Sequence, residues 1–219
     1  MMSITVEKTL EMPTAVIFAQ RLEAALKKEK TKRKHFYETI DESKKMEFIN
    51  GEIYFQSPVK LQHNTATKRI VKLLDTYVET HGLGYVGVEK ILISLTRNDY
   101  EPDICFFDLE KSITFTPKQM QFPAPDFVVE ILSESTERND RETKFQDYAA
   151  HDVKEYWIVD PEAETVEQYV VDNEKYELKL KSNDGTIESV AVHGFKIPIR
   201  SIFDEALNLE TLRRIVSHD

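Results

Sequence analysis

The chain has 219 residues, of which 41% are hydrophobic and 31% are charged, with only 6 glycines and 8 prolines. This composition excludes collagen-like and disordered chains and fits one domain with an N-terminal appendage. The longest apolar runs have about five residues, far fewer than the ~20 that cross a bilayer, and residues 1–8 lack the pattern of a signal peptide. A single cysteine, Cys105, cannot form an internal disulfide and suits a reducing compartment. We therefore expect a soluble, cytoplasmic protein.

The formal net charge of -10 is unevenly distributed along the chain. Residues 1–72 carry 14 basic and 9 acidic residues, whereas residues 73–219 carry 15 and 30. The basic excess is densest between Lys27 and Lys34, where six of eight residues are Lys or Arg. Such a cluster is typical of a solvated helix end, but it also suits an arm that follows a phosphate backbone. Charge alone leaves both interpretations open.

The first part of the chain predicts two helices with a hairpin between them. Apolar residues at helical spacing predict a helix over residues 15–28, with Thr14 as its N-cap. Two short apolar runs then flank Asn50-Gly51, the strongest short signal for a β-hairpin. From His63 to His81 the pattern is that of a long amphipathic helix, which Gly82 ends.

From residue 85 onward the pattern mainly predicts strands. The predicted strands are Tyr85–Leu95, Asp103–Phe107, Phe127–Leu132, Tyr156–Asp160, Val166–Val171 and Tyr176–Leu180. A helix, Asp140–His151, separates the third and fourth, with Asn139 as N-cap and Glu142 completing a capping box. This strand–helix–strand series indicates a right-handed crossover between parallel strands. A meander and a short helix, Leu207–Val216, follow. We expect an α/β (α+β) fold, with a mixed central β-sheet flanked by helices.

Three common kinds of site are excluded. The segment from Gly82 to Gly87 matches G-x-G-x-x-G, but a dinucleotide-binding loop follows a strand and precedes a helix, and here the order is reversed. The six histidines are scattered and there is one cysteine, so no zinc pattern exists. The chain has no G-x-S-x-G motif, and Cys105 within a strand is expected to be a buried, inert thiol.

An acidic residue interrupts the strand Phe127–Leu132. Glu130 lies on the face opposite to Phe127, Val129 and Ile131, in a run that otherwise suits a fully buried strand. A lone buried carboxylate costs several kcal/mol unless it is neutralised, paired or bound to a metal. Glu130 is therefore either structural, in an ion pair with Arg138 or Lys144, or functional. We favour the functional interpretation.

A second acid and a lysine accompany it. Asp103 stands at the start of the preceding strand, where on its own it would be an ordinary loop-capping residue. Lys144 and Tyr148 lie one turn apart on the next helix, beside the sheet end that Glu130 approaches. Hard oxygen ligands without His or Cys favour Mg²⁺ or Mn²⁺, and a lysine supplies positive charge for a phosphoryl transition state. The set predicts metal-assisted phosphodiester hydrolysis.

Several motifs follow one another in a recognisable order. They are Met46–Glu52, Ser57-Pro58, His63, Pro102-Asp103, Pro125–Ser133, Thr136, Asp140, Lys144, Tyr148 and Glu155–Pro161. Over about residues 40–205 this order resembles the bacterial Uma-two family of restriction-endonuclease-like proteins, within the PD-(D/E)xK phosphodiesterase superfamily. The resemblance implies a restriction-endonuclease-like domain at residues 39–219, after an N-terminal helical and basic segment at 1–38. It also implies a Mg²⁺- or Mn²⁺-dependent endonuclease that acts on DNA as a homodimer.

The resemblance implies a set of metal ligands. Asp103 and Glu130 would hold the ion, with the main-chain carbonyl of Ile131 as a third ligand. Glu52, in preference to Glu47, resembles the additional N-terminal acid of the superfamily. The alternative is that both glutamates are surface residues of the hairpin.

The third catalytic residue is displaced relative to the superfamily pattern. Its lysine normally stands two residues after the second acid, where this chain has Leu132. Lys144, on the following helix, is expected to take its place. Two other functions stay open because residues 73–219 are acidic: a non-catalytic interaction protein on the same fold, and a metal-dependent hydrolase of another phosphate ester, such as a nucleotide.

Overall fold

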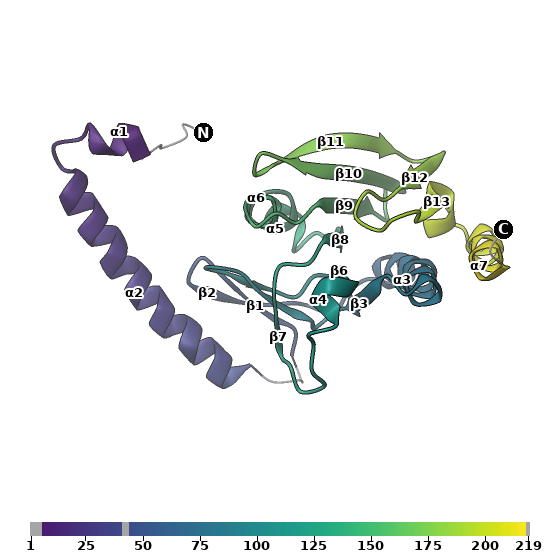
Figure 1. Ribbon diagram of the computed structural model, residues 1–219, viewed down its shortest axis with the longest axis horizontal. Helices are drawn as coiled ribbons and strands as arrows, with labels where there is room; N and C mark the ends of the chain where they lie inside the picture. The colour runs from purple at the N-terminus through teal and green to yellow at the C-terminus, as the bar shows by residue number, and fades with distance from the viewer. Residues whose placement is uncertain (1–5, 41–43, 218–219) are drawn as a thin grey trace.

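A computed structural model describes residues 6–40 and 44–217 of the protein. Within these residues, six strands form the central sheet (Figure 1). In spatial order they are β11 (Lys175–Ser182), β10 (Thr165–Asp172), β9 (Glu155–Asp160), β8 (Phe127–Ile131), β6 (Ile104–Asp108) and β3 (Gly84–Val88). β8 and β9 are parallel, and the other neighbours are antiparallel. The predicted mixed α/β fold is confirmed.

The crossover between β8 and β9 contains two short helices, α5 (Glu137–Arg141) and α6 (Thr143–Ala150). The predicted parallel crossover is confirmed, but the prediction of a single helix capped by Asn139 is wrong. Thr136 precedes the first helix, because main-chain bonds from Glu137 to Ser133 and from Asp140 to Thr136 start the helical turn earlier. Glu142, with φ -114° and ψ -71°, separates the two helices.

A second sheet lies beside the first. In spatial order its strands are β2 (Glu52–Phe55), β1 (Met46–Ile49), β5 (Asp99–Tyr100), β4 (Leu92–Ser94) and β7 (Gln121–Phe122). The hairpin predicted at Asn50-Gly51 is confirmed, and both residues have positive φ, 52° and 85°. The predicted strand 85–95 is divided between the two sheets, because Glu89 and Lys90 turn the chain with φ near +40°.

Longer helices cover the face of the central sheet that is opposite to α6. α3 (Leu61–His81) packs against α7 (Glu205–Ser217) (Figure 1), and Gly82 ends α3 in the left-handed conformation, as expected. Between residues 109 and 202 the smaller elements are α4 (Leu109–Ser112), β12 (Thr186–Glu188), β13 (Lys196–Pro198) and the 3₁₀ helix η1 (Ile199–Ile202). In the described part of the chain, no helix is both long and apolar enough to span a membrane.

The two faces of β8 belong to different parts of the core. Phe127, Val129 and Ile131 pack into the apolar cluster that α3 covers. Val128 and Leu132 pack into a second cluster with residues of α6 and the second sheet. Because side chains alternate along a strand, Glu130 faces this second cluster. Its carboxylate is therefore placed where three elements meet.

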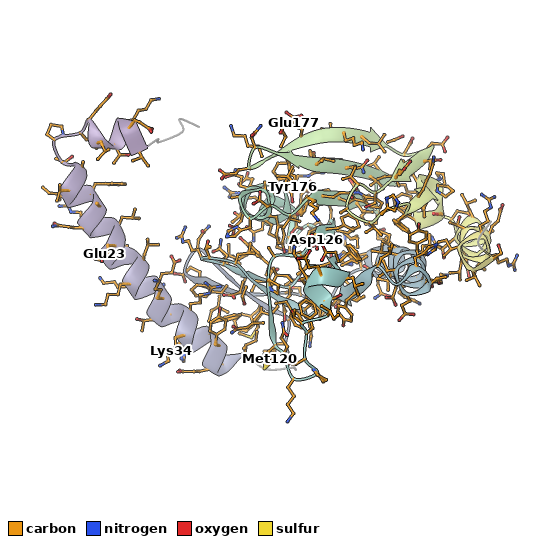
Figure 2. All side chains as sticks on the ribbon, viewed as in Figure 1. Glu23, Lys34, Met120, Asp126, Tyr176 and Glu177 are labelled. Atoms are coloured by element: carbon orange, nitrogen blue, oxygen red, sulfur yellow. The ribbon has the colours of Figure 1, made fainter. Side chains whose placement is uncertain are left out.

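α2 (Ala15–Thr39) extends away from both sheets, with α1 (Val6–Leu10) at its far end (Figure 1). Thr14 precedes the helix as predicted, but its side chain makes no capping bond. Figure 2 shows Glu23 on the part of α2 that stands clear of the protein. Only the last turns are attached: Phe36 is buried against Phe48. The domain boundary that we predict after residue 38 falls in the last turn of this helix.

Candidate active site

Antiparallel pairing of β6 and β8 brings the two predicted acids together. Ile104 pairs with Val129, so continuing the register by one residue sets Asp103 opposite Glu130. The main-chain N–H of Asp103 faces Glu130 Oε2 at 3.4 Å, and the N–H of Ile131 donates to Asp103 Oδ2 at 2.9 Å. Both side chains are buried, with 5% and 2% of their surface exposed.

Lys144 reaches the same place from α6. Its Nζ lies 3.0 Å from Glu130 Oε1, Glu47 Oε1 and Asp140 Oδ1. The side chain is almost fully buried, so these carboxylates replace its hydration. The structure thus joins Asp103, Glu130 and Lys144, and the ion pair that we considered as a structural role for Glu130 is also present. Arg138, the other partner considered, pairs with Glu142 on the surface.

The buried cluster has strongly shifted acidities. Burial disfavours the ammonium of Lys144, but Asp140, Glu130 and Glu47 outweigh it and raise the pKa of Lys144 well above its usual value. Burial also raises the pKa of Glu130 well above its usual range, and Lys144 offsets this only in part because other carboxylates add to it. Glu130 therefore takes up a proton, or an equivalent positive charge, more readily than an ordinary glutamate.

Asp103 has the opposite shift because two basic side chains touch it. Lys45 Nζ lies 3.1 Å from Asp103 Oδ1, and His63 Nε2 lies 3.2 Å from Oδ2. Burial alone would raise the pKa of Asp103, but His63, Lys45 and the N–H of Ile131 lower it well below its usual value. The pKa values of these two adjacent carboxyl groups are therefore shifted in opposite directions. Lys45 had no signal in the sequence, and His63 was visible only as part of a motif.

Of the two glutamates considered as the additional N-terminal acid, the structure places Glu47 in the cluster and the preferred Glu52 outside it. Glu47 is buried on β1, where its Oε1 accepts the N–H of Glu101 at 3.0 Å and contacts Lys144. Glu52 is two-thirds exposed on β2 and pairs with Lys32 of α2. The reason is that β1 is buried on both faces, whereas β2 is an edge strand whose residues are mostly exposed.

The charge balance of the cluster favours a bound cation. Four acidic side chains, of Glu47, Asp103, Glu130 and Asp140, share two lysines and His63, so acidic groups outnumber basic ones. Among the described residues, no group of three or more His, Cys, Asp or Glu side chains is arranged to hold a metal ion. Asp103 and Glu130 nevertheless fit one hard divalent cation, because both offer carboxylate oxygen to the same pocket and such ions complete their shell with main-chain oxygen and water.

A pocket of about 290 Å³ leads from the surface to this cluster. His63, Asp103, Glu130 and Lys144 line it, together with residues at the start of α3 and in the loop after β8. Cys105, by contrast, is buried in the core and its pKa is raised by burial. The pocket, with its acids, lysine and buried histidine, is therefore the candidate active site.

Comparison with known proteins identifies the family and the fold. The family model Uma2, described as "Putative restriction endonuclease", matches residues 34–200. A crystal structure of a protein from Anabaena variabilis, described as a putative nuclease belonging to DUF820, has a similar fold: the TM-score is 0.67 at 18% identity, covering 81% of this chain and 96% of that one. No curated protein matches the sequence.

Proposed function

Because the chain belongs to the Uma2 family of restriction-endonuclease-like proteins, we propose that it is a Mg²⁺- or Mn²⁺-dependent endonuclease that hydrolyses phosphodiester bonds of DNA. One observation carries the proposal: Asp103, immediately before β6, and Glu130 of β8 line the same pocket and are joined by main-chain hydrogen bonds, with Lys144 Nζ 3.0 Å from Glu130. Paired carboxylates beside a lysine suit the stabilisation of charge that develops on a phosphoryl group.

The metal would be held by Asp103 and Glu130, with the carbonyl of Ile131 as a further ligand. When bound, such an ion supplies Lewis acidity and lowers the pKa of water. Glu52 has no part in the proposal, since its side chain lies on the surface. Glu47 acts indirectly, through its contact with Lys144.

The remaining residues prepare the two carboxylates. Lys144 has three carboxylate neighbours and donates a hydrogen bond to Glu130 Oε1, so it positions that oxygen. Oε2 receives the long contact from the N–H of Asp103 and keeps a lone pair for a ligand. Lys45 and His63 keep Asp103 ionised down to low pH. Both acids are therefore fixed in place before substrate arrives, which reduces the cost of ordering them.

Cleavage of supercoiled plasmid tests this function. Wild type is expected to nick plasmid with Mg²⁺ or Mn²⁺ and not with EDTA, whereas Asp103→Asn and Glu130→Gln should lose at least about 100-fold of that activity. Glu52→Gln, a glutamate outside the pocket, is the matched control and should cleave like wild type. Calorimetric titration with Mn²⁺ should show binding by wild type and Glu52→Gln but not by the other two.

Two other outcomes lead to the alternatives. Mn²⁺ binding without cleavage of any DNA would favour a hydrolase of a smaller phosphate ester, which the modest size of the pocket and the acidity of residues 73–219 also suit. In that case wild type should still hydrolyse the small diester bis-p-nitrophenyl phosphate, and Glu130→Gln should not. If the protein neither binds Mn²⁺ nor cleaves any of these substrates, the remaining interpretation is a non-catalytic interaction protein.

We extend the proposal to assembly and location. Cutting both strands of a duplex requires two active sites, which a homodimer supplies. Phe18, Leu22 and Leu26 form an exposed apolar row on α2, at the i, i+4, i+8 spacing of one helix face, and they offer a surface for a second copy. A DNA substrate and a single buried thiol support a cytoplasmic location.

A further inference from the structure

We propose that Lys45 is a tethered cation that competes with the metal ion for Asp103, and that Glu101 receives its ammonium when the ion binds. Lys45 and Glu101 are then positioning residues that set the metal affinity of the site. This inference rests on the proposed metal site at Asp103 and Glu130. The case depends on the partners of Asp103, on the place of Lys45, and on a buried carboxylate beside it.

The two carboxylate oxygens of Asp103 differ in their partners. Oδ2 accepts the main-chain N–H of Ile131 at 2.9 Å and lies 3.2 Å from His63 Nε2. Oδ1 has one partner among the described residues, the ammonium of Lys45 at 3.1 Å. Since a carboxylate oxygen accepts about two hydrogen bonds, Oδ1 is the oxygen with capacity for a metal ion. Lys45 and such an ion therefore compete for the same atom.

The ammonium of Lys45 lies in the field of both proposed ligands. Its side chain is only 13% exposed. Burial disfavours the ammonium, but Asp103 and Glu130 outweigh it and raise the pKa of Lys45. A divalent ion on these two carboxylates adds two positive charges beside this ammonium, and like charges repel strongly in a partly buried site. Lys45 must therefore leave Asp103 Oδ1 when an ion binds.

Glu101 lies beside the main chain of Lys45. Its Oε2 accepts the N–H of Met46, the residue after Lys45, at 2.8 Å. Only 3% of Glu101 is exposed, and no basic side chain in the described part of the chain forms an ion pair with it. Burial raises the pKa of Glu101 to about 7, and the N–H of Met46 and the charge of Lys45 oppose this shift most. A buried carboxylate of this kind gains from a cation.

Both carboxylates lie near one lysine whose main chain is fixed. The carbonyl of Lys45 accepts the N–H of Gln56 at 3.1 Å. Glu101 is held in turn, because its N–H donates to Glu47 at 3.0 Å, and Asp103 follows it by two residues. The flexible four-carbon stem of a lysine lets the ammonium turn from Asp103 to Glu101 while the main chain stays in place.

This exchange keeps the charges of the site paired in both states. Lys45 neutralises Asp103 before an ion binds and Glu101 afterwards. Two effects of opposite sign follow for the metal affinity. Removing the charge of Lys45 should tighten metal binding, because a competitor is lost. Removing the charge of Glu101 should weaken it, because the displaced ammonium then lacks an acceptor.

Calorimetric titration with Mn²⁺ measures both effects. Lys45→Met should bind Mn²⁺ about tenfold more tightly than wild type, and Glu101→Gln about tenfold more weakly. The double variant should bind like Lys45→Met, because Glu101 acts only through Lys45. Lys32→Met and Glu52→Gln, which break an exposed lysine–glutamate pair outside the pocket, are the matched controls and should bind like wild type.

Two further variants keep the test valid if Lys45→Met does not fold, which its melting temperature shows. Lys45→Gln also removes the charge but can still donate a hydrogen bond to Asp103, and it should tighten binding. Lys45→Arg keeps the charge and should bind no more tightly than wild type. If Lys45 had only a structural role, all three substitutions would weaken binding.

The outcomes separate this inference from the proposed function. If wild type binds Mn²⁺ and neither uncharged variant of Lys45 binds it more tightly, the metal site stands and the exchange is overturned. The same holds if Glu101→Gln weakens binding equally with and without Lys45. If no variant binds Mn²⁺, the metal site and the exchange both fall. If the affinities change as expected but wild type cleaves no plasmid, the exchange stands and the DNA substrate falls.

Discussion

Lys144 sets the energetics of the site at the level of single residues. Its ammonium is the shared partner of Glu47, Glu130 and Asp140, so removing it leaves three buried carboxylates without their cation. Breaking a buried pair in this way typically costs about 3–5 kcal/mol. We therefore predict that Lys144→Met lowers the free energy of unfolding by about 3–5 kcal/mol, measured by urea denaturation at pH 7.

Lys32→Met is the control for that measurement. Lys32 also pairs with a glutamate, Glu52, but both side chains are more than half exposed, and such pairs contribute at most about 1 kcal/mol. If Lys144→Met cost no more than Lys32→Met, the buried cluster would not be held together by charge. The same denaturation measurement shows whether a variant is folded, and only a folded variant can report on catalysis in the cleavage assay.

Some residues of the candidate site could be predicted from the sequence, because their signal comes from neighbouring residues in the chain. Glu130 interrupts an apolar strand, and alternation along the strand fixes its face; the order of motifs then adds Asp103 and Lys144. Lys45 could not be predicted, because only the packing of the second sheet against the first brings it to Asp103. The positions of Glu47 and Glu52 could not be distinguished for the same reason: both glutamates flank one turn, and only the burial of β1 brings Glu47, and not Glu52, to the cluster.

At the scale of elements, α2 divides into an anchor and a free part. Phe36 is fully buried, whereas Phe18, on the same helix, is 43% exposed. Replacing a buried phenylalanine with alanine lowers the free energy of unfolding by about 3–5 kcal/mol, whereas substitutions on the surface change it by less than about 0.5 kcal/mol. We predict such a loss of stability for Phe36→Ala and almost none for Phe18→Ala, measured by thermal and urea unfolding.

Substitutions in the free part of α2 also test the assembly. If the exposed apolar row of α2 joins two copies, Phe18→Ala with Leu22→Ala should weaken dimerisation in sedimentation velocity runs while the monomer stays folded. A wild-type protein that is monomeric at every concentration would contradict the proposed homodimer, without affecting the role of Phe36.

The position of α5 depends on an ion pair with the sheet. Glu167 of β10 accepts hydrogen bonds from both terminal nitrogens of Arg141, at 3.0 and 3.1 Å, and Arg141 follows Asp140 of the buried cluster. Burial alone would raise the pKa of Glu167, but hydrogen bonds from Arg141, Tyr169 and Lys181 outweigh it and lower the pKa to about 2. The contact is therefore strongest when Glu167 is ionised.

This shift predicts a dependence of stability on pH. A carboxylate with a lowered folded pKa contributes fully above its unfolded value of 4.5 and loses that contribution as pH falls toward about 2. Because Arg141 and Lys181 are partly exposed, we expect about 1–2 kcal/mol. Wild type should therefore lose more stability than Glu167→Gln between pH 5 and pH 2.5 in urea titrations, and equal slopes would contradict the assignment.

Elements were easier to predict than their ends. The amphipathic pattern of α3 and the turn at Asn50-Gly51 suffice to place both, because each depends on neighbours in the chain. The strand predicted at 85–95 is divided because Glu89 and Lys90 adopt positive φ, which their residue types do not indicate. The sequence pattern also does not predict the break at Glu142, although this break separates the helix of Asp140 from that of Lys144.

At the scale of the whole molecule, the structure shows where the basic cluster of the sequence lies relative to the acidic domain. Part of the basic cluster is used structurally, since Arg33 makes two hydrogen bonds to Asp99 and Lys32 pairs with Glu52. Lys27, Lys28, Lys30 and Lys34 have exposed side chains on the same helix, whose N-terminal part extends away from the acidic domain (Figure 1). An arm of this kind can follow a phosphate backbone while the acidic surface stays at a distance.

DNA binding should therefore depend on salt through α2. Each lysine that neutralises a phosphate contributes about 0.9 to the slope of log affinity against log salt concentration. Replacing Lys27, Lys28, Lys30 and Lys34 with glutamine should reduce that slope by about 0.9 for each lost contact, as measured by fluorescence anisotropy of a labelled duplex in Ca²⁺ or EDTA. All four side chains are exposed, so melting temperature should not change.

A variant with the same change in net charge at other positions decides whether placement matters. Lys118, Lys175, Lys179 and Lys196 lie on the domain itself, outside α2. If general attraction between charges governs binding, replacing these four lysines with glutamine should lower the slope as much as the change in α2 does. If α2 is an arm for DNA, the control should keep nearly the wild-type slope. A slope that is equal in wild type and both variants would instead show that neither set of lysines contacts the phosphates, whereas no measurable binding by wild type would favour the smaller phosphate ester as substrate.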